Sequence, residues 1–156
     1  MSQVYAIVRL RGRVGVNYHA KKTLDLLRLR RVNHAVLYRS DPVIDGMLHK
    51  IKDIVTWGEV NQDTIEHLLK KRGQKAGRIN ISDKDVKENT DFSTIKKLSK
   101  ALAKGDLKMK DVPTIKPVFR LSPPRKGFRS LKNPYNRRGD LGYRGEAINQ
   151  LISRMA

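Results

Sequence analysis

The sequence predicts an α/β (α+β) domain with a βαβαβ core, followed by a helical extension and an extended C-terminal segment. Three observations support this. Apolar, strand-like segments fall at residues 3–10, 33–39 and 53–60. Apolar residues between them recur at helical spacing over 17–28 and 42–50. The chain of 156 residues suits one domain. We expect the three strands to form one sheet, with the helices packed on one side of it.

The first half of the core begins with "QVYAIVRL", which is apolar enough for a central strand. Asn17 is placed to cap the helix that follows, because its side chain can accept hydrogen bonds from the first turn. Within this helix Ala20, Leu24 and Leu27 share one face. The segment therefore predicts a strand, a connecting loop and a helix.

The second half of the core repeats this order. "NHAVLYRS" predicts a strand, and Asp41 followed by Pro42 is a favourable start for a helix. The apolar positions of that helix are Val43, Ile44, Met47, Leu48 and Ile51. "DIVTWGEV" predicts the third strand and completes the βαβαβ order.

The remaining chain predicts three more helices and one edge strand. The helices are marked by Ile65, Leu68 and Leu69, by Ile95, Leu98 and Leu102, and by Ile148, Leu151, Ile152 and Met155. "TIKPVFRL" suits only a sheet edge, because proline lacks the N–H that an inner strand needs. We divide the chain into a core (1–60), a helical extension (61–115), a basic arm (116–144) and a C-terminal helix (145–156).

Charge narrows the classes of partner. The chain has 34 lysines and arginines against 15 acidic residues, a formal net charge of +19. A polyanion would neutralise this excess, with nucleic acid as the first candidate and an anionic membrane surface as the second. No apolar run reaches the roughly 18 residues of a membrane-spanning helix, and the first residues lack the features of a signal peptide. We expect a cytoplasmic protein. With no cysteine, the chain has neither disulfides nor thiolate zinc sites.

The loop "RLRGRVGVN" is the first candidate binding site. Glycines let backbone N–H groups approach an anion, and the following helix start carries a positive dipole. The alternative is an ordinary turn, which would require the glycines but would not explain the arginines. The GxxG loop of KH domains joins two helices, whereas a strand precedes this one, and neither phosphate-loop nor dinucleotide patterns occur. Alternation along the strand predicts that the side chains of Arg9 and Arg11 lie on the face of the sheet opposite to that of Val8, or beyond the sheet edge. The candidate residues are Arg9, Arg11, Gly12, Arg13 and Gly15.

The basic arm, residues 116–144, is the second candidate. Stacking and phosphate-binding side chains alternate along it, a combination that suits single-stranded or irregular RNA. Its prolines and glycines predict little structure of its own, so we expect the arm to order on its partner. A disordered basic tail is the alternative. The candidate residues are Arg120, Arg125, Lys126, Phe128, Arg129, Lys132, Tyr135, Arg137, Arg138, Tyr143 and Arg144, with Phe119 nearby.

The sharpest enzymatic alternative is a metal site on the second helix. Asp41, Asp45 and His49 recur every four residues and could ligate a metal from one helix face. Their positions equally suit a helix cap, a first-turn acid and a late-helix histidine. No nucleophile elbow or second acidic cluster accompanies them, so we predict no catalytic site.

The core also carries a resemblance. "VYAIVRLRGRVG", "TLDLLRLRRVNHAVLY" and "DPVIDGMLHKIKDIVTWGEV" resemble the ribosomal protein L thirty family of the large subunit, which includes eukaryotic L seven. The most specific parts are "LRLRRVNH" and "GMLHKI", and the match spans Val4 to Val60. The later "LSPPRKG" and the C-terminal helix are similar to the archaeal branch. We expect an archaeal-type member, because the sequence shows no long basic N-terminal extension like that of the eukaryotic branch.

The resemblance implies a ferredoxin-like core, no catalytic activity and no cofactor. It implies a structural place on the large ribosomal subunit against its rRNA, near 5S rRNA and neighbouring ribosomal proteins. By position, the arginines of "RLRGRVG" and the link residues Arg28, Arg30 and Arg31 would contact rRNA. A free-standing RNA chaperone or assembly factor remains an alternative, and a metal-dependent enzyme is a more remote one.

Overall fold

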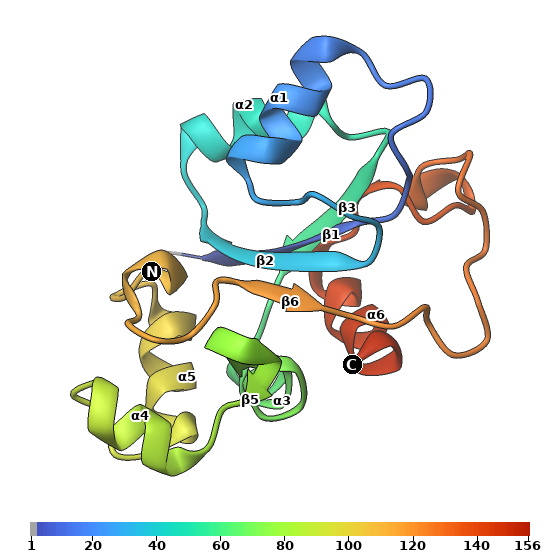
Figure 1. Ribbon diagram of the computed structural model, residues 1–156. Helices are drawn as coiled ribbons and strands as arrows, with labels where there is room; N and C mark the ends of the chain where they lie inside the picture. Colours follow the sequence, from blue (N-terminus) through green and yellow to red (C-terminus); the bar gives the residue numbers. More distant parts are fainter. Residues whose placement is uncertain (1–2) are drawn as a thin grey trace.

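A five-stranded sheet forms the centre of the molecule, in the order β6-β2-β1-β3-β7 (Figure 1). The computed structural model describes residues 3–156. β1 (Val4–Arg9) is antiparallel to both β2 (His34–Arg39) and β3 (Val55–Glu59). β6 (Val118–Arg120) adds an antiparallel edge beside β2, and β7 (Gly142–Tyr143) a parallel edge beside β3. The α/β class, the βαβαβ order and the edge position of the proline-flanked strand are confirmed.

Two helices cover the first face of the sheet. They are α1 (Tyr18–Leu26) and α2 (Pro42–Lys50), which lie side by side above it in Figure 1. The Asn17 side chain accepts hydrogen bonds from His19 and Ala20 N–H, and the Asp41 side chain accepts one from Val43 N–H. Both predicted caps are therefore present. The helices pack through a cluster that includes Ala20, Leu24, Leu27, Leu48 and Ile51, which meets Ile7 of β1.

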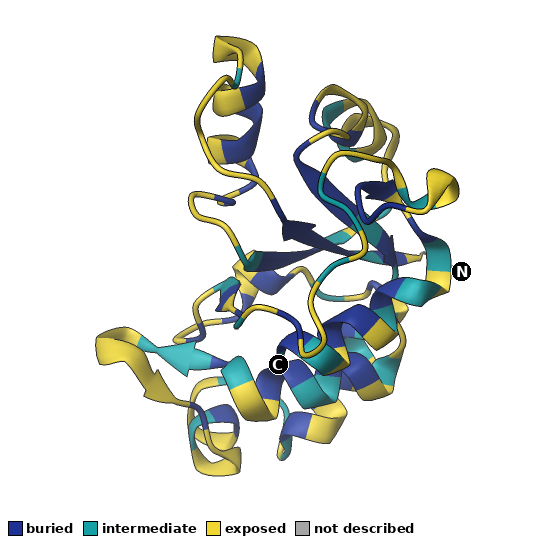
Figure 2. Cartoon of the chain, turned by 90° about the vertical axis from the view of Figure 1, so that its right-hand side faces the viewer, coloured by how far each residue is buried: buried dark blue, intermediate teal, exposed yellow. Residues whose placement is uncertain are grey.

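Three further helices cover the opposite face, where the sequence led us to expect none. They are α3 (Gln62–Arg72), α5 (Ile95–Lys104) and α6 (Ile148–Met155). Their apolar stripes meet Ala6 and Val8 of β1 in a second, larger cluster. The expectation of helices on one side only is wrong, because alternate residues of β1 are apolar on both faces and each face must be buried. Figure 2 shows the resulting dark, buried sheet between exposed outer surfaces.

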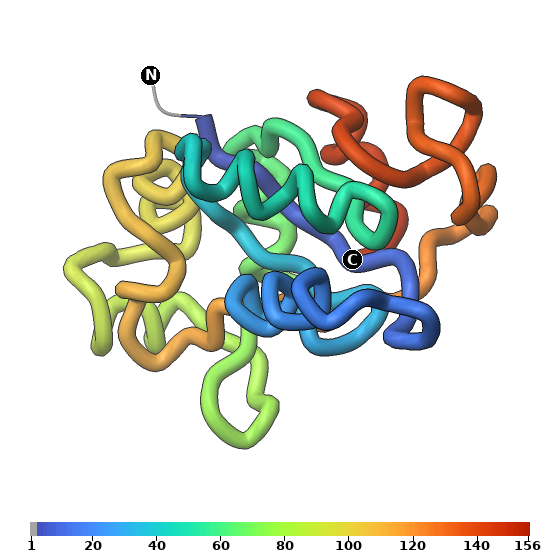
Figure 3. The backbone as a smooth tube through the Cα atoms, turned by 90° about the horizontal axis from the view of Figure 1, so that it is seen from above, coloured from blue at the N-terminus to red at the C-terminus, as the bar shows by residue number. Residues whose placement is uncertain are grey.

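Short elements absent from our predictions complete the extension. A hairpin of β4 (Gln74–Lys75) and β5 (Ile79–Asn80) projects from the body in Figure 3. Its tip is the 3₁₀ turn η1 (Ala76–Arg78), where Gly77 has a φ of 82°. Helix α4 (Asp83–Asn89) follows, started by a reciprocal Ser82–Asp85 capping box. These elements are too short for periodicity to reveal.

The basic arm, residues 116–144, is packed rather than extended, and this corrects our expectation. It supplies both edge strands, and Phe119, Leu121 and Leu141 are buried in the larger cluster. The short turns η2 (Met109–Asp111), η3 (Tyr135–Arg137) and η4 (Gly145–Ala147) shape the chain before, within and after it. The proline and glycine content of the arm predicted little structure, but these few apolar side chains anchor the arm to the sheet.

The contact between β3 and η4 is unusually close. A Cβ built on Gly58 would lie 1.9 Å from the carbonyl oxygen of Gly145. Any larger residue at 58 would therefore collide with backbone. Gly58 lets the chain that leads from β7 into α6 lie directly against the sheet.

Candidate nucleic-acid interface

The arginine-rich loop leaves β1 and projects into solvent before α1. The backbone N–H groups of Leu10 and Arg11 both donate to the carbonyl of Ile54, which holds the base of the loop at 2.9 and 3.2 Å. Gly15 has a φ of 73°, and no atom lies within 4 Å of a Cβ built there or on Gly12. Every residue from Arg11 to Gly15 is exposed. The loop predicted to bind an anion is therefore open and faces solvent.

Arg11 and Arg13 are exposed but partly oriented by the backbone. Arg11 Nη1 donates to the carbonyl of Asp53 at 3.3 Å, and Arg13 Nη2 donates to the carbonyl of Arg30 at 3.3 Å. The second bond joins the loop to the link between α1 and β2. Each guanidinium has five donor N–H groups, so most of its donors remain available to a ligand.

The link carries three exposed arginines around one buried anchor. Leu29 is fully buried, and its N–H donates to the carbonyl of Leu24 at 2.9 Å. Arg28, Arg30 and Arg31 are exposed on either side of it, and Arg28 has a φ of 63°. The anchor thus turns the charged neighbours outward.

Arg9 differs from the other arginines of the loop and corrects a prediction. It is only 2% exposed. Its Nη1 donates to the carbonyl of Leu29 at 2.7 Å, and its Nε donates to the carbonyl of Arg11 at 2.9 Å. Burial, and secondarily the charge of Arg13, lowers the pKa of Arg9, while Asp25 opposes the shift. Arg9 is on the predicted face, but α1 and the link cover that face, so Arg9 ties loop and link together.

Arg120 of β6 joins the same region through His34. The two residues are paired across the β2–β6 ladder, and Arg120 is exposed. Burial first, and then the charges of Arg120, Arg31 and Arg9, lowers the pKa of His34. Within residues 3–156, the buried His34 Nδ1 has no hydrogen-bond partner. His34 therefore lies among cations from three segments, and these together with burial favour its neutral form.

These contacts bring five exposed arginines from three separate parts of the chain to one end of the sheet. We call this set the arginine surface. No member forms an ion pair with a carboxylate within the described residues 3–156. Its members are Arg11, Arg13, Arg30, Arg31 and Arg120.

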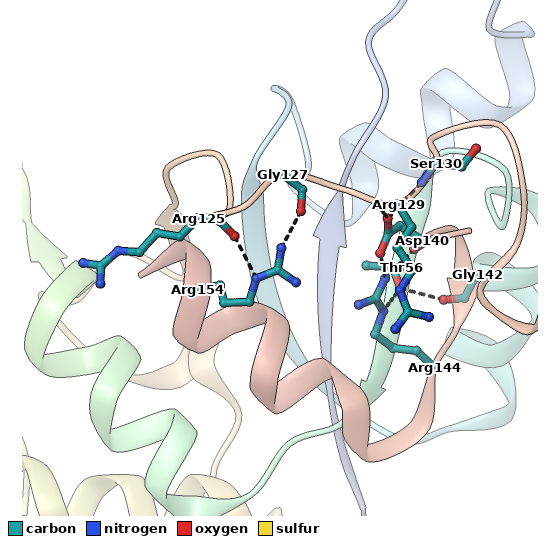
Figure 4. A network of polar contacts seen from close by, with 9 residues as sticks. All are labelled: Thr56, Arg125, Gly127, Arg129, Ser130, Asp140, Gly142, Arg144 and Arg154. Carbon is teal, nitrogen blue, oxygen red and sulfur yellow. Dashed lines mark hydrogen bonds and ion pairs between the residues drawn. The ribbon is translucent and has the colours of Figure 1, made fainter. Parts of the chain in front are cut away.

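The first part of the arm docks on the C-terminal helix. Ser122 N–H donates to the carbonyl of Met155 at 3.0 Å, and Arg125 N–H donates to the carbonyl of Arg154 at 3.2 Å. In return Arg154 Nε donates to the carbonyl of Arg125 at 3.0 Å, and its Nη2 donates to that of Gly127 (Figure 4). Arg154 is thus the side chain that fixes residues 125–127.

The second part of the arm is organised by a buried polar network, also drawn in Figure 4. Arg144 Nη2 donates to Asp140 Oδ1 at 2.9 Å, and its Nε donates to Thr56 Oγ1 at 2.8 Å. Asp140 Oδ2 accepts the backbone N–H groups of Arg129 and Ser130. Arg144 is 8% exposed, so its predicted place among the RNA-binding cations is not supported. Asp140 is the one acidic residue of the arm, and that isolation is the only sequence signal of the network.

The aromatic residues of the arm have separate environments. Phe128 packs against the larger core cluster, and the Tyr135 ring lies 4.9 Å from the guanidinium carbon of Arg144. Tyr143 is 53% exposed, and its hydroxyl donates to Glu59, a bond that raises the pKa of Tyr143 to about 12. Only Tyr143 presents a largely open ring. Phe128 and Tyr135, which we expected to be available for stacking on bases, instead contact other parts of the protein.

The other cations of the arm remain on the surface. Lys126 and Arg138 both have positive φ, at turns that hold them away from the core. The exposed set comprises Lys116, Arg125, Lys126, Arg129, Lys132, Arg137 and Arg138. The arm therefore presents its charge from fixed turns rather than from a flexible tail.

The residues of the alternative metal site have structural positions. Asp41 caps α2, whereas Asp45 and His49 are exposed in its first and last turns. Within residues 3–156, no group of three His, Asp or Glu side chains is placed to hold a metal ion. None of the helices in this part of the chain is long and apolar enough to cross a membrane.

Comparison with known proteins gives one consistent result. A family model described as ribosomal protein L30p/L7e matches residues 5–55. The large ribosomal subunit protein uL30 of Thermoplasma volcanium is 45% identical over 150 residues, covering 96% of this chain and 91% of the relative. Its counterpart in Methanosphaera stadtmanae is 44% identical, covering 97% of this chain and 99% of the relative. The counterpart in Hyperthermus butylicus is 48% identical, covering 98% of this chain and 90% of the relative.

Proposed function

This chain belongs to the ribosomal protein L30p/L7e family, and from this we propose where RNA binds on its surface. The protein is a structural constituent of the large ribosomal subunit and not an enzyme. Its partners are rRNA and neighbouring ribosomal proteins of the cytoplasmic ribosome. What remains to be assigned is where the RNA lies on this chain.

We propose that the arginine surface binds the backbone of folded rRNA. The observation behind this proposal is the convergence of exposed arginines from the loop, the link and β6, none of which forms an ion pair within residues 3–156. Guanidinium groups bind phosphate oxygens through paired hydrogen bonds, and an unbalanced charge of +19 favours a polyanion. Arg28, Gly12 and Gly15 belong to the same interface, because all three are exposed in the loop and the link that carry these charges.

The exposed cations of the arm extend this interface. They lie on turns fixed by Asp140 and Arg154, so binding does not first have to order a tail. Tyr143 is the one arm aromatic available to stack on an unpaired base. We include 5S rRNA among the RNA partners, on the resemblance of the chain to archaeal members of the family.

The test is binding of the full chain to large-subunit rRNA and 5S rRNA over a salt series. If about 6–10 phosphates are neutralised, the log–log slope should be about −0.7 to −0.9 per contact. Duplex DNA is the control, and equal affinity for it would argue against recognition of folded RNA. Sedimentation with large subunits after a high-salt wash separates a constituent, which remains in stoichiometric amount, from a chaperone or assembly factor, which is released.

A further inference from the structure

A cavity lies where the end of β2 meets the start of α2, the end of α5 and the following loop. Its volume is about 390 Å³, within the range of small-ligand sites. Leu37, Leu102 and Met109 line it and are buried, whereas Ile44 and Leu107 line it and are half-buried. The cavity is separate from the arginine surface, which supplies none of its lining residues.

Two polar residues with unused hydrogen-bonding capacity also line the cavity. The hydroxyls of Tyr38 and Ser40 make no hydrogen bond within residues 3–156. Burial raises the pKa of Tyr38, an effect that the charge of Arg28 opposes, so the hydroxyl stays protonated and can donate. Two hydroxyls beside apolar side chains would orient a flat ligand with polar edges.

The charges around the cavity indicate the class of ligand. Four exposed cations line it, namely Arg28, Arg39, Lys108 and Lys110. The one carboxylate in the lining, Asp41, caps α2 through the N–H of Val43. A ligand that matches this arrangement has an apolar, planar body and negative groups on both sides.

We propose that this cavity, the nucleotide cavity, holds one unstacked base of the bound RNA, with the flanking phosphates on the four surrounding cations. This inference rests on the proposed function, since the base belongs to the same rRNA. The aliphatic side chains cover the base faces, and the hydroxyls of Tyr38 and Ser40 bond to its edge. An acidic or apolar segment of a neighbouring protein is the competing occupant.

Methionine methyl groups report on the cavity directly. The full chain, labelled with ¹³C at its methionine methyls, is titrated with an oligomer of four abasic sugar phosphates around one adenosine. The reference probe has five abasic units and the same charge. Met109 lines the cavity, and Met47 and Met155 do not. We expect the Met109 signal to move with the adenosine oligomer only, and that oligomer to bind about tenfold more tightly, the effect of one stacked base.

Two neighbouring positions on α2 supply matched variants. Ile44→Trp places a large ring in the cavity, whereas Val43→Trp changes a residue that is 67% exposed and does not line it. The first should abolish the Met109 shift and the tenfold preference, and the second should retain both. A thermal unfolding curve for each variant confirms that it is folded.

The remaining outcomes separate this inference from the proposed function. If the wild-type chain binds rRNA with a steep salt dependence but Met109 responds equally to both oligomers or to neither, the nucleotide cavity is refuted alone. A Met109 shift on addition of an acidic or apolar peptide, without one on addition of the adenosine oligomer, assigns the cavity to a protein partner and also refutes it. Failure to bind rRNA at all overturns both proposals.

Discussion

Arg144 and Asp140 form a buried ion pair, with Arg144 Nη2 2.9 Å from Asp140 Oδ1 and both side chains less than 10% exposed. Arg144 also bonds to Thr56 of β3, and Asp140 accepts two backbone N–H groups of the arm. The pair therefore connects the sheet to the turns that present the exposed cations.

The first prediction concerns this pair. Asp140→Ala leaves a buried guanidinium without its carboxylate, which costs on the order of 3–5 kcal/mol. Urea unfolding should show that loss in the free energy of unfolding. Lys132→Ala, an exposed change in the same arm, should stay within about 0.5 kcal/mol of the wild type. Equal stabilities of the two variants would mean that the pair does not hold the arm.

The second prediction is that the arm is ordered in the free protein. The N–H groups of Ser130, Tyr135 and Leu141 donate to groups inside the arm. Their amide hydrogens should exchange slowly without RNA. Those of Lys126 and Arg138, which have no acceptor within residues 3–156, should exchange rapidly. Uniformly rapid exchange across the arm would restore the expectation that order comes from the RNA.

The third prediction separates Arg9 from its neighbours. Arg9→Ala removes a buried side chain that bonds to the carbonyls of Leu29 and Arg11, and leaving the buried Leu29 carbonyl unpaired costs about 1–3 kcal/mol. Arg11→Ala with Arg13→Ala should leave the thermal midpoint nearly unchanged. The double variant should instead make the salt slope of rRNA binding shallower by roughly one per lost phosphate contact. The opposite pattern, with stability lost only in the double variant, would contradict the arginine surface.

The fourth prediction uses the titration of His34. Its folded-state pKa lies below the ordinary 6.5, so the unfolded chain binds the proton more readily. The stability that neutral His34 contributes is complete above pH 6.5 and declines as the pH falls through the folded-state pKa. In NMR titrations Arg120→Ala should raise the pKa of His34, and Lys132→Ala should not. Bound RNA should also raise it, because phosphates favour the charged imidazole.

Local sequence signals predicted the elements of the core well. Asn17 and Asp41 are identifiable as caps because each bonds to N–H groups within three residues. Leu24 and Leu27 are identifiable as core residues because their spacing matches one helix face. Such signals span a few residues, so no tertiary information is needed to interpret them.

The candidate site was less predictable because burial depends on distant parts of the chain. Alternation places Arg9 on the correct face of β1 but does not show that Leu29, 20 residues later, will cover it. Arg144 looks like any other cation of the arm, yet Thr56, 88 residues earlier, accepts its Nε–H. The candidate residues that lie on the surface, such as Arg13 and Arg30, are those whose exposure the long-range packing preserves.

The short strands at the two margins of the sheet have a consequence for the protein before it reaches its RNA. An open sheet margin offers unpaired N–H and C=O groups on which another chain can add a strand and begin aggregation. Here the margins are β6, of three residues, and β7, of two. Pro117 precedes β6 and has no N–H to extend its pairing. A newly made copy therefore offers little template for self-association, and its mutual charge repulsion further keeps copies apart until assembly.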